Sequence, residues 1–172
     1  TKIIFRLYKI FVNNGFSAIR FNFRGVGKSN GMYDDGDGEL SDATSVLDWL
    51  QQYNTNSKIC WVAGFSFGAW VSMQLLMRRP EINGFISVSP PANLRDFSFL
   101  APCPSSGLII HGDRDNIASF DSTKILTEKL QKQKKADIKF KAIKGADHFY
   151  ENYSEEFTTI VDNYIKDNLK SN

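Results

Sequence analysis

The fold of this chain is decided by residues 59–77, which read ICWVAGFSFGAWVSMQLLM. Residues 59–63 form an apolar run short enough for a buried strand. Residues 70–77 are apolar almost all round, as in a helix packed against a sheet. Between them, residues 64–68 match G-x-S-x-G, which places Ser66 on a tight turn with its hydroxyl above the sheet. We interpret the flanking Gly64 and Gly68 as avoiding collisions with the neighbouring strand and helix. The alternative is an ordinary glycine-rich turn in which Ser66 caps the helix.

Strand-like and helix-like segments alternate on both sides of this stretch. Apolar spacing predicts helices around residues 4–11 (with Ile4, Leu7, Tyr8 and Phe11 on one face), 40–50, 125–130 and 157–169, and strands at 18–23, 85–88, 108–110 and 138–143. This alternation is typical of an α/β fold with a mostly parallel, doubly wound sheet. The length fits one domain, residues 1–172. In such sheets, functional residues gather at the carboxyl ends of the strands.

A serine hydroxyl needs a base to become a good nucleophile, and the chain has two histidines. His148 lies in the segment GADHF, just after the predicted strand at 138–143. It is therefore expected at a carboxyl end of the sheet, within reach of Ser66. His111 closes the predicted strand at 108–110, where we expect it to order the turn through a hydrogen bond. We predict that His148 is the base.

The third member of a triad is a carboxylate that holds the imidazole in the right tautomer. Asp115 and Asp113 both follow the predicted strand at 108–110 and are both candidates. Asp113 has an alternative role in capping the turn backbone. Asp147 is adjacent to His148 and cannot easily face its ring, so we treat it as a loop residue. The order serine, aspartate, histidine is that of the α/β hydrolases and differs from the chymotrypsin and subtilisin orders.

Over its whole length the chain resembles the α/β-hydrolase superfamily. The matching segments are GFSFG at 64–68, HGDRD at 111–115, GADH at 145–148 and FNFRGVGKS at 21–29, which resembles an R-G-x-G-x-S turn. The stretch through Tyr33, Gly38, Glu39 and Asp42 looks like short, capless bacterial serine hydrolases, related to carboxylesterases, thioesterases and dienelactone hydrolases. The resemblance implies Asp115 as the triad acid. It also implies that the amide of Phe67 donates to the oxyanion.

One departure from the superfamily concerns the N-terminal region. Hydrolases of this type begin with further strands and a loop that supplies a second oxyanion-hole amide, whereas here the first recognisable element is already the helix after that loop. We therefore expect an N-terminally truncated sequence, a sheet with an uncovered edge or face, and no second donor within this chain. Losing one such donor costs about 10²–10³ in rate.

Composition and spacing argue against several other functions. The net charge is +2, from 21 basic and 19 acidic residues without a basic stripe, which argues against nucleic acid as a partner. No long uninterrupted apolar stretch suggests a membrane span. Cys60 and Cys103 lack metal-ligand spacing, and two cysteines fit a reducing cytoplasm. We predict a cytoplasmic protein without cofactor or metal.

Two further segments imitate ligand-binding motifs. Gly27-Lys28-Ser29 follows a predicted strand, as the end of a phosphate loop does, but no helix pattern begins after it. The acidic residues between Asp34 and Asp42 do not have EF-hand spacing. We expect these acidic residues to favour the start of the helix around residues 40–50.

Two functions remain. The first is a serine hydrolase that cleaves a small ester or thioester, or an amide, through an acyl-enzyme. The second is a non-catalytic α/β-hydrolase scaffold that binds a ligand or partner. Residues 89–106 stand where many relatives insert a lid, and their length suggests an open, shallow site. Phe97, Phe99 and Leu100 in this segment could line an acyl pocket or belong to the core.

Overall fold

The computed structural model describes residues 1–170, which form five helices and four strands. In chain order these are α1 (Lys2–Asn13), α2 (Asp37–Gln52), β1 (Trp61–Phe65), α3 (Phe67–Arg78), β2 (Gly84–Val88), β3 (Gly107–Gly112), α4 (Phe120–Lys132), β4 (Ile138–Ile143) and α5 (Ser154–Leu169). Almost every predicted element is present, with bounds that differ by a few residues.

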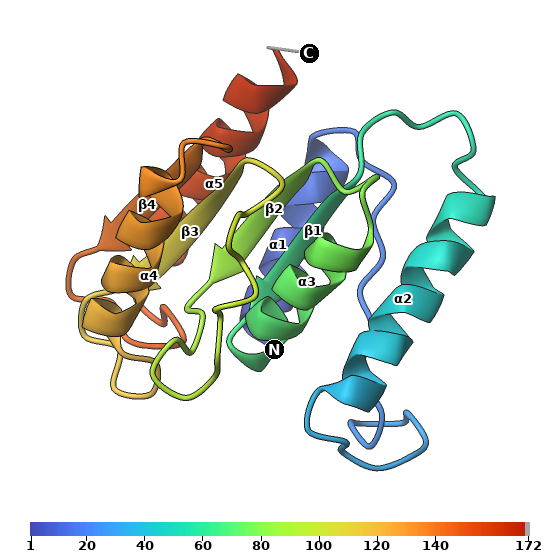
Figure 1. Ribbon diagram of the computed structural model, residues 1–172, viewed down its shortest axis with the longest axis horizontal. Helices are drawn as coiled ribbons and strands as arrows, with labels where there is room; N and C mark the ends of the chain where they lie inside the picture. Colours follow the sequence, from blue (N-terminus) through green and yellow to red (C-terminus); the bar gives the residue numbers. More distant parts are fainter. Residues whose placement is uncertain (171–172) are drawn as a thin grey trace.

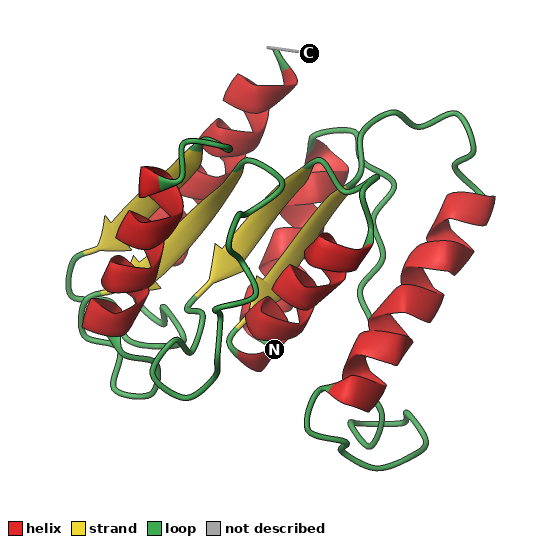
Figure 2. Ribbon diagram, viewed as in Figure 1, coloured by secondary structure: helices red, strands yellow, loops and turns green. Residues whose placement is uncertain are grey.

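The four strands form one parallel sheet in the order β1-β2-β3-β4. Each strand is joined to the next by a crossover, which contains α3 after β1 and α4 after β3 (Figure 1). All four carboxyl ends therefore lie at the same edge of the sheet, where the arrowheads of Figure 2 meet the loops. This arrangement confirms the predicted α/β fold with a parallel sheet.

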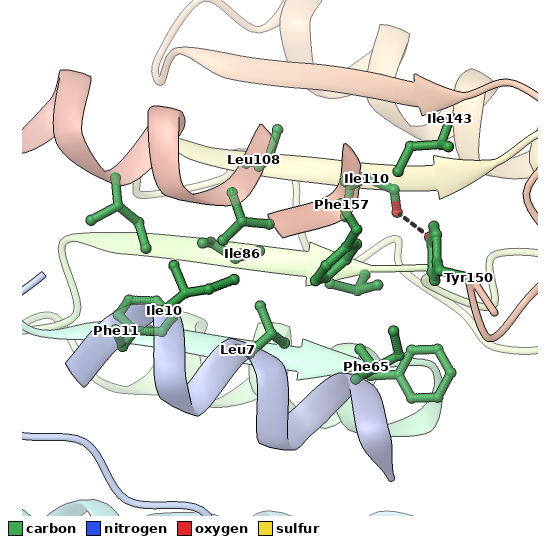
Figure 3. Close-up of a cluster of buried hydrophobic side chains, with 14 of the residues drawn as sticks. Leu7, Ile10, Phe11, Phe65, Ile86, Leu108, Ile110, Ile143, Tyr150 and Phe157 are labelled. Atoms are coloured by element: carbon green, nitrogen blue, oxygen red, sulfur yellow. Dashed lines mark hydrogen bonds between the residues drawn. The ribbon is translucent and has the colours of Figure 1, made fainter. Parts of the chain in front are cut away.

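Helices cover both faces of the sheet. Helices α1 and α5 pack on one face, and α3 and α4 pack on the other, with α2 lying outside α3 (Figure 1). The first face buries Leu7, Ile10, Ile86 and Phe157 among others (Figure 3). The second buries a separate cluster that includes Val71, Leu76, Phe85 and Ile109. Strands β2 and β3 are buried throughout because both of their faces are covered, which explains their continuous apolar sequences.

One prediction near the N-terminus needs correction. Residues 16–23 are extended but form no ladder with any described strand, so the strand predicted at 18–23 is absent; a strand requires a hydrogen-bonded neighbour. The buried face of α1 consists of Ile3, Leu7, Ile10 and Phe11. Ile4, Leu7, Tyr8 and Phe11, predicted to share one face of this helix, all line an apolar cavity of about 380 Å³ that also borders residues 16–23 and β1.

This cavity lies beside the outer edge of β1. Within residues 1–170, β1 pairs with β2 alone, so its other edge has no strand beside it. Its first three residues are accordingly only half-buried, whereas β2 is buried throughout. An uncovered edge was expected from the sequence. None of the helices in this part of the chain is both long and apolar enough to cross a membrane.

Candidate active site

Ser66 lies on a sharp turn between β1 and α3. Its backbone has φ 54° and ψ −121°, a conformation that a non-glycine residue adopts only when its surroundings impose it. Its N–H donates to the carbonyl of Val88 at 2.8 Å, which continues the β1–β2 ladder through the strained residue. The turn therefore projects the Ser66 side chain beyond the carboxyl end of the sheet.

The two glycines of the turn have different roles. A side chain at Gly64 would overlap the backbone of Gly68 and Ala69, so the strand and helix can approach closely only because residue 64 is glycine. At Gly68, an added Cβ would meet nothing nearer than a ring carbon of Phe23, at 3.9 Å. The prediction that both glycines avoid collisions is thus right for Gly64 and wrong for Gly68.

A chain of hydrogen bonds connects the three predicted site residues. The Ser66 Oγ lies 3.0 Å from Nε2 of His148, and Nδ1 of the same imidazole lies 2.6 Å from Oδ2 of Asp115. The three residues come from the ends of β1, β3 and β4, as parallel topology allows. Because a carboxylate can only accept, we assign the imidazole proton to Nδ1. Nε2 then carries a lone pair directed at the Ser66 hydroxyl.

Asp115 is anchored by donors on both of its oxygens. Oδ1 accepts the backbone N–H groups of Ile117 and Ala118 at 2.9 and 2.8 Å. Oδ2 faces two imidazoles, His148 at 2.6 Å and His111 at 3.2 Å. Burial by itself would raise the pKa of the Asp115 carboxyl, but the bonds from both imidazoles and both amides outweigh it and hold the pKa well below its usual range. Asp115 is therefore a carboxylate at neutral pH although its side chain is fully buried.

The other two aspartates considered for this role lie elsewhere. Asp113 accepts the N–H of Gly145 at 2.6 Å and so fixes the loop that leads to His148. Asp113 thus caps a turn backbone, which was the alternative role considered for it, although the capped turn is that of residue 145 and not its own. Asp147 accepts the N–H of Glu151 within its own loop, in agreement with its treatment as a loop residue.

Tyr150 anchors the loop that carries His148. This side chain is completely buried, and its hydroxyl lies 2.7 Å from Oγ of Ser89 and 3.3 Å from the carbonyl oxygen of Ile110 (Figure 3). Since the carbonyl can only accept, the phenol donates to Ile110 and accepts from Ser89. Ser89 and Tyr150 both have positive φ, at 47° and 54°. This contact ties the His148 loop to the ends of β2 and β3.

Aromatic rings surround the serine and the imidazole. The ring of Phe65 stacks at a tilt 4.8 Å from the His148 ring, and Phe149 packs edge-on against it at 5.1 Å. Phe149 is 48% exposed and thus available to a substrate. On the other side, Tyr33 lies 5.7 Å from the ring of Phe67. The walls beside Ser66 are therefore largely apolar.

Arg95 fastens two loops together at this apolar wall. Its guanidinium donates to Asp35 at 2.6 Å and to the hydroxyl of Tyr33 at 2.7 Å, and it lies over the rings of Phe67 and Trp70. The segment after β2 is thereby attached to the loop before α2.

The remaining predictions concern the oxyanion hole and the acyl pocket. The amide of Phe67 is the first of α3, and no acceptor within residues 1–170 bonds to it, so it is free to meet a negative charge. Phe97 and Leu100 are buried in the core beneath α3, and Phe99 packs against the same cluster. Of their two alternatives, packing is the one the structure supports.

The segments that imitate ligand-binding motifs are occupied by internal contacts. The Ser29 hydroxyl donates to the carbonyl of Asn22, and the next helix begins only at Asp37. Glu39 accepts the backbone N–H groups of Asp34 and Gly36 at the start of α2, as expected for a capping role. The described residues contain no cluster of three or more histidine, cysteine, aspartate or glutamate side chains that could hold a metal ion.

Several residues around the site were not identified from the sequence. The Ser89–Tyr150 pair and the Arg95 contacts join segments far apart in the chain, and no local pattern indicates them. The approach of His111 to Asp115, four residues later, depends on the geometry of the turn between them. Phe65 and Phe149 could have been noticed, because each is adjacent in sequence to a predicted site residue.

Known proteins resemble this chain in sequence and structure. A family model described as X-Pro dipeptidyl-peptidase (S15 family) matches residues 5–168. A protein from Rickettsia prowazekii without an assigned function is 51% identical over 168 residues, which cover 95% of this chain and 71% of that protein.

Solved structures give the same picture. A protein of unknown function from Agrobacterium tumefaciens, grouped with the α/β hydrolases, superimposes with a TM-score of 0.96 at 50% identity and covers 99% of this chain and 78% of that one. An α/β serine hydrolase without a lid from Xanthomonas campestris has a TM-score of 0.86 at 30% identity, with 96% and 72% covered.

Proposed function

Because the chain belongs to the X-Pro dipeptidyl-peptidase (S15) family and to the lid-less bacterial α/β serine hydrolases, we propose that it cleaves a small ester or thioester through an acyl-enzyme on Ser66. The observation that carries this proposal is the unbroken hydrogen-bond chain from Ser66 through His148 to Asp115. In this proposal the three side chains act as nucleophile, base and acid, and the amide of Phe67 donates to the oxyanion.

The first half of the reaction transfers the acyl group to the protein. The Ser66 oxygen attacks the substrate carbonyl carbon while its proton passes to Nε2 of His148 over the 3.0 Å hydrogen bond. The imidazolium that forms is stabilised by the buried carboxylate of Asp115. The negative carbonyl oxygen accepts the N–H of Phe67, at the positive end of α3. Collapse of the intermediate breaks the bond to the leaving alcohol or thiol, which takes the proton from Nε2.

The second half releases the acid and restores the site. A water molecule gives a proton to Nε2 of His148 and its oxygen attacks the acyl carbon, and Ser66 leaves with the proton returned from the imidazole. The same base thus serves both halves without a metal or cofactor among the groups it uses.

The preference for small substrates follows from the surroundings of Ser66. The segment between β2 and β3 turns Phe97 and Leu100 into the core and contributes no long helix over the site. Phe149 is exposed beside the imidazole and offers an apolar contact to an acyl or leaving group. An open site of this kind favours a compact substrate over a long lipid chain. The family description names a peptidase, so amides belong in the same test.

The proposal is tested by measuring hydrolysis of p-nitrophenyl acetate, a short acyl thioester and a proline-containing p-nitroanilide by the full-length protein. We expect turnover of the ester and thioester, loss of activity in Ser66→Ala and His148→Ala, and wild-type rates in Ser45→Ala, an exposed serine on α2 that serves as the matched control. Turnover of the anilide alone would replace the ester proposal with a peptidase.

The rival function, a scaffold that binds without catalysis, rests on the oxyanion site. Phe67 supplies one donor, and we identify no second donor within residues 1–170. A full-length protein that folds normally but hydrolyses none of the three substrates would favour this alternative.

A further inference from the structure

We propose that His111 is a positioning residue of this site, whose Nε2–H bonds to the carbonyl of Ala118 beside Asp115 and thereby helps to fix the carboxylate that orients His148. The inference rests on the proposed function and adds a fourth residue to it. The Nε2 atom of His111 lies 3.2 Å from Oδ2 of Asp115 and 3.0 Å from the carbonyl oxygen of Ala118. The sequence suggested for His111 only a hydrogen bond that orders the turn.

The protonation of His111 follows from its partners. Both groups that face Nε2, a carboxylate and a carbonyl, can only accept hydrogen bonds, so Nε2 must carry a proton. The other ring nitrogen, Nδ1, is buried and has no hydrogen-bond partner among the described residues. A proton on Nδ1 would be an unsatisfied buried donor, which is costly. His111 is therefore a neutral imidazole that donates from Nε2.

The position of His111 makes this donor rigid. Its side chain is fully buried, and its ring packs edge-on against Phe120 at 5.9 Å. It is the next-to-last residue of β3 and lies four residues before Asp115, at the other end of one tight turn. Gly112, between them, lies so close to the backbone of Ala146 that a side chain would collide with it. The turn is thus locked against the loop that carries His148.

The donor has a chemical consequence for the imidazole of His148. Both imidazoles share the same oxygen, Oδ2, and His111 neutralises part of its negative charge. The Ala118 carbonyl that accepts from His111 belongs to the residue whose N–H donates to Oδ1 of Asp115. If His111 no longer donates, Asp115 is held less firmly in line with Nδ1 of His148, and the imidazole is less well oriented toward Ser66.

Two variants separate the donor from the volume of the side chain. His111→Leu fills a similar space without a donor, whereas His111→Gln keeps an N–H group near the place of Nε2. In His111→Leu we expect kcat to fall about 10- to 100-fold, with little change in KM. In His111→Gln, kcat should return most of the way to wild type. Equal impairment of both folded variants, or an unchanged kcat in His111→Leu, would overturn the proposal.

NMR of the imidazole nitrogens provides a readout that does not depend on catalysis and can be made on the wild-type protein. We expect His111 to show a protonated Nε2 and an unprotonated Nδ1. This result does not depend on hydrolysis of any substrate, so failure of this inference is distinguishable from failure of the proposed function. A His111 with its proton on Nδ1 would refute the inference directly.

Discussion

Replacing Asp115 by asparagine would test how the site controls the tautomer of its histidine. The amide must orient itself among the existing donors. The N–H groups of Ile117 and Ala118 both point at Oδ1, so the asparagine oxygen has to remain there. The NH₂ group then occupies the place of Oδ2, where it faces Nδ1 of His148 and the Nε2 proton of His111. Nδ1 of His148 must therefore give up its proton and accept.

The expected loss follows from this rearrangement. With Nδ1 as an acceptor, the neutral imidazole carries its proton on Nε2, which faces the Ser66 oxygen and can no longer take a proton from it. A triad with the wrong tautomer loses about 10⁴ in kcat, or about 5.4 kcal/mol at 1.36 kcal/mol per tenfold change. Rates of p-nitrophenyl acetate hydrolysis by the wild type and Asp115→Asn measure this loss of kcat, and circular dichroism shows whether the variant is folded.

A neighbouring aspartate serves as the control for this experiment. Asp113→Asn keeps an oxygen for the Gly145 amide and does not face the imidazole, so we expect its kcat to stay within about threefold of wild type. A folded Asp115→Asn protein that retains more than about a tenth of wild-type kcat would refute the reasoning, because Nε2 would then still be acting as a base.

Three further predictions concern stability and pH. Tyr150→Phe leaves the buried Ser89 hydroxyl without its partner and should lower the free energy of unfolding in urea by about 1–3 kcal/mol. The double variant with Ser89→Ala should lose less than the sum of the two single losses, and simple additivity would contradict the coupling of these two side chains. Gly64→Ala should abolish both folding of the turn and activity because its Cβ meets backbone, whereas Gly68→Ala should leave Tm unchanged or raised; equal effects would show that the turn is not so constrained. The pKa of Asp115 is lowered in the folded state, so its charge stabilises the fold above the ordinary carboxyl pKa of roughly 4 and loses that effect as the pH falls. The Tm difference between wild type and Asp115→Asn should therefore narrow from about pH 7 to about pH 3. A difference that widens would contradict a lowered pKa.

The sequence was sufficient for those parts of the molecule that local patterns control. Continuous apolar runs at β2 and β3 indicate strands covered on both faces, and G-x-S-x-G indicates the turn at Ser66 because a strand ends before it and a helix begins after it. Residues after the strand ends are brought to one edge by parallel pairing. These features were enough to select Ser66 and His148 and to leave Asp113 and Asp115 as candidates for the acid. The resemblance to the α/β hydrolases implied Asp115, and the structure brings Ser66, Asp115 and His148 together.

Contacts between distant segments could not be predicted in the same way. Residues 18–23 have the composition of a strand, but strand formation depends on a neighbour, and none of the described strands lies beside them. The sequence groups Ile4, Leu7, Tyr8 and Phe11 on one face of α1, but which residues of this helix become fully buried, Ile3 and Ile10 among them, depends on how the helix packs on the sheet. The approach of His111 to Asp115 depends on the geometry of the turn at residues 111–115, which the spacing of the motif alone does not specify.

Mass spectrometry of the full-length protein after reaction with a fluorophosphonate probe tests the assignment of the nucleophile most directly. We predict a single adduct on the peptide that contains Ser66, lost in Ser66→Ala and formed much more slowly in His148→Ala. An adduct on a different serine, or a folded protein that the probe leaves unmodified, would contradict the account.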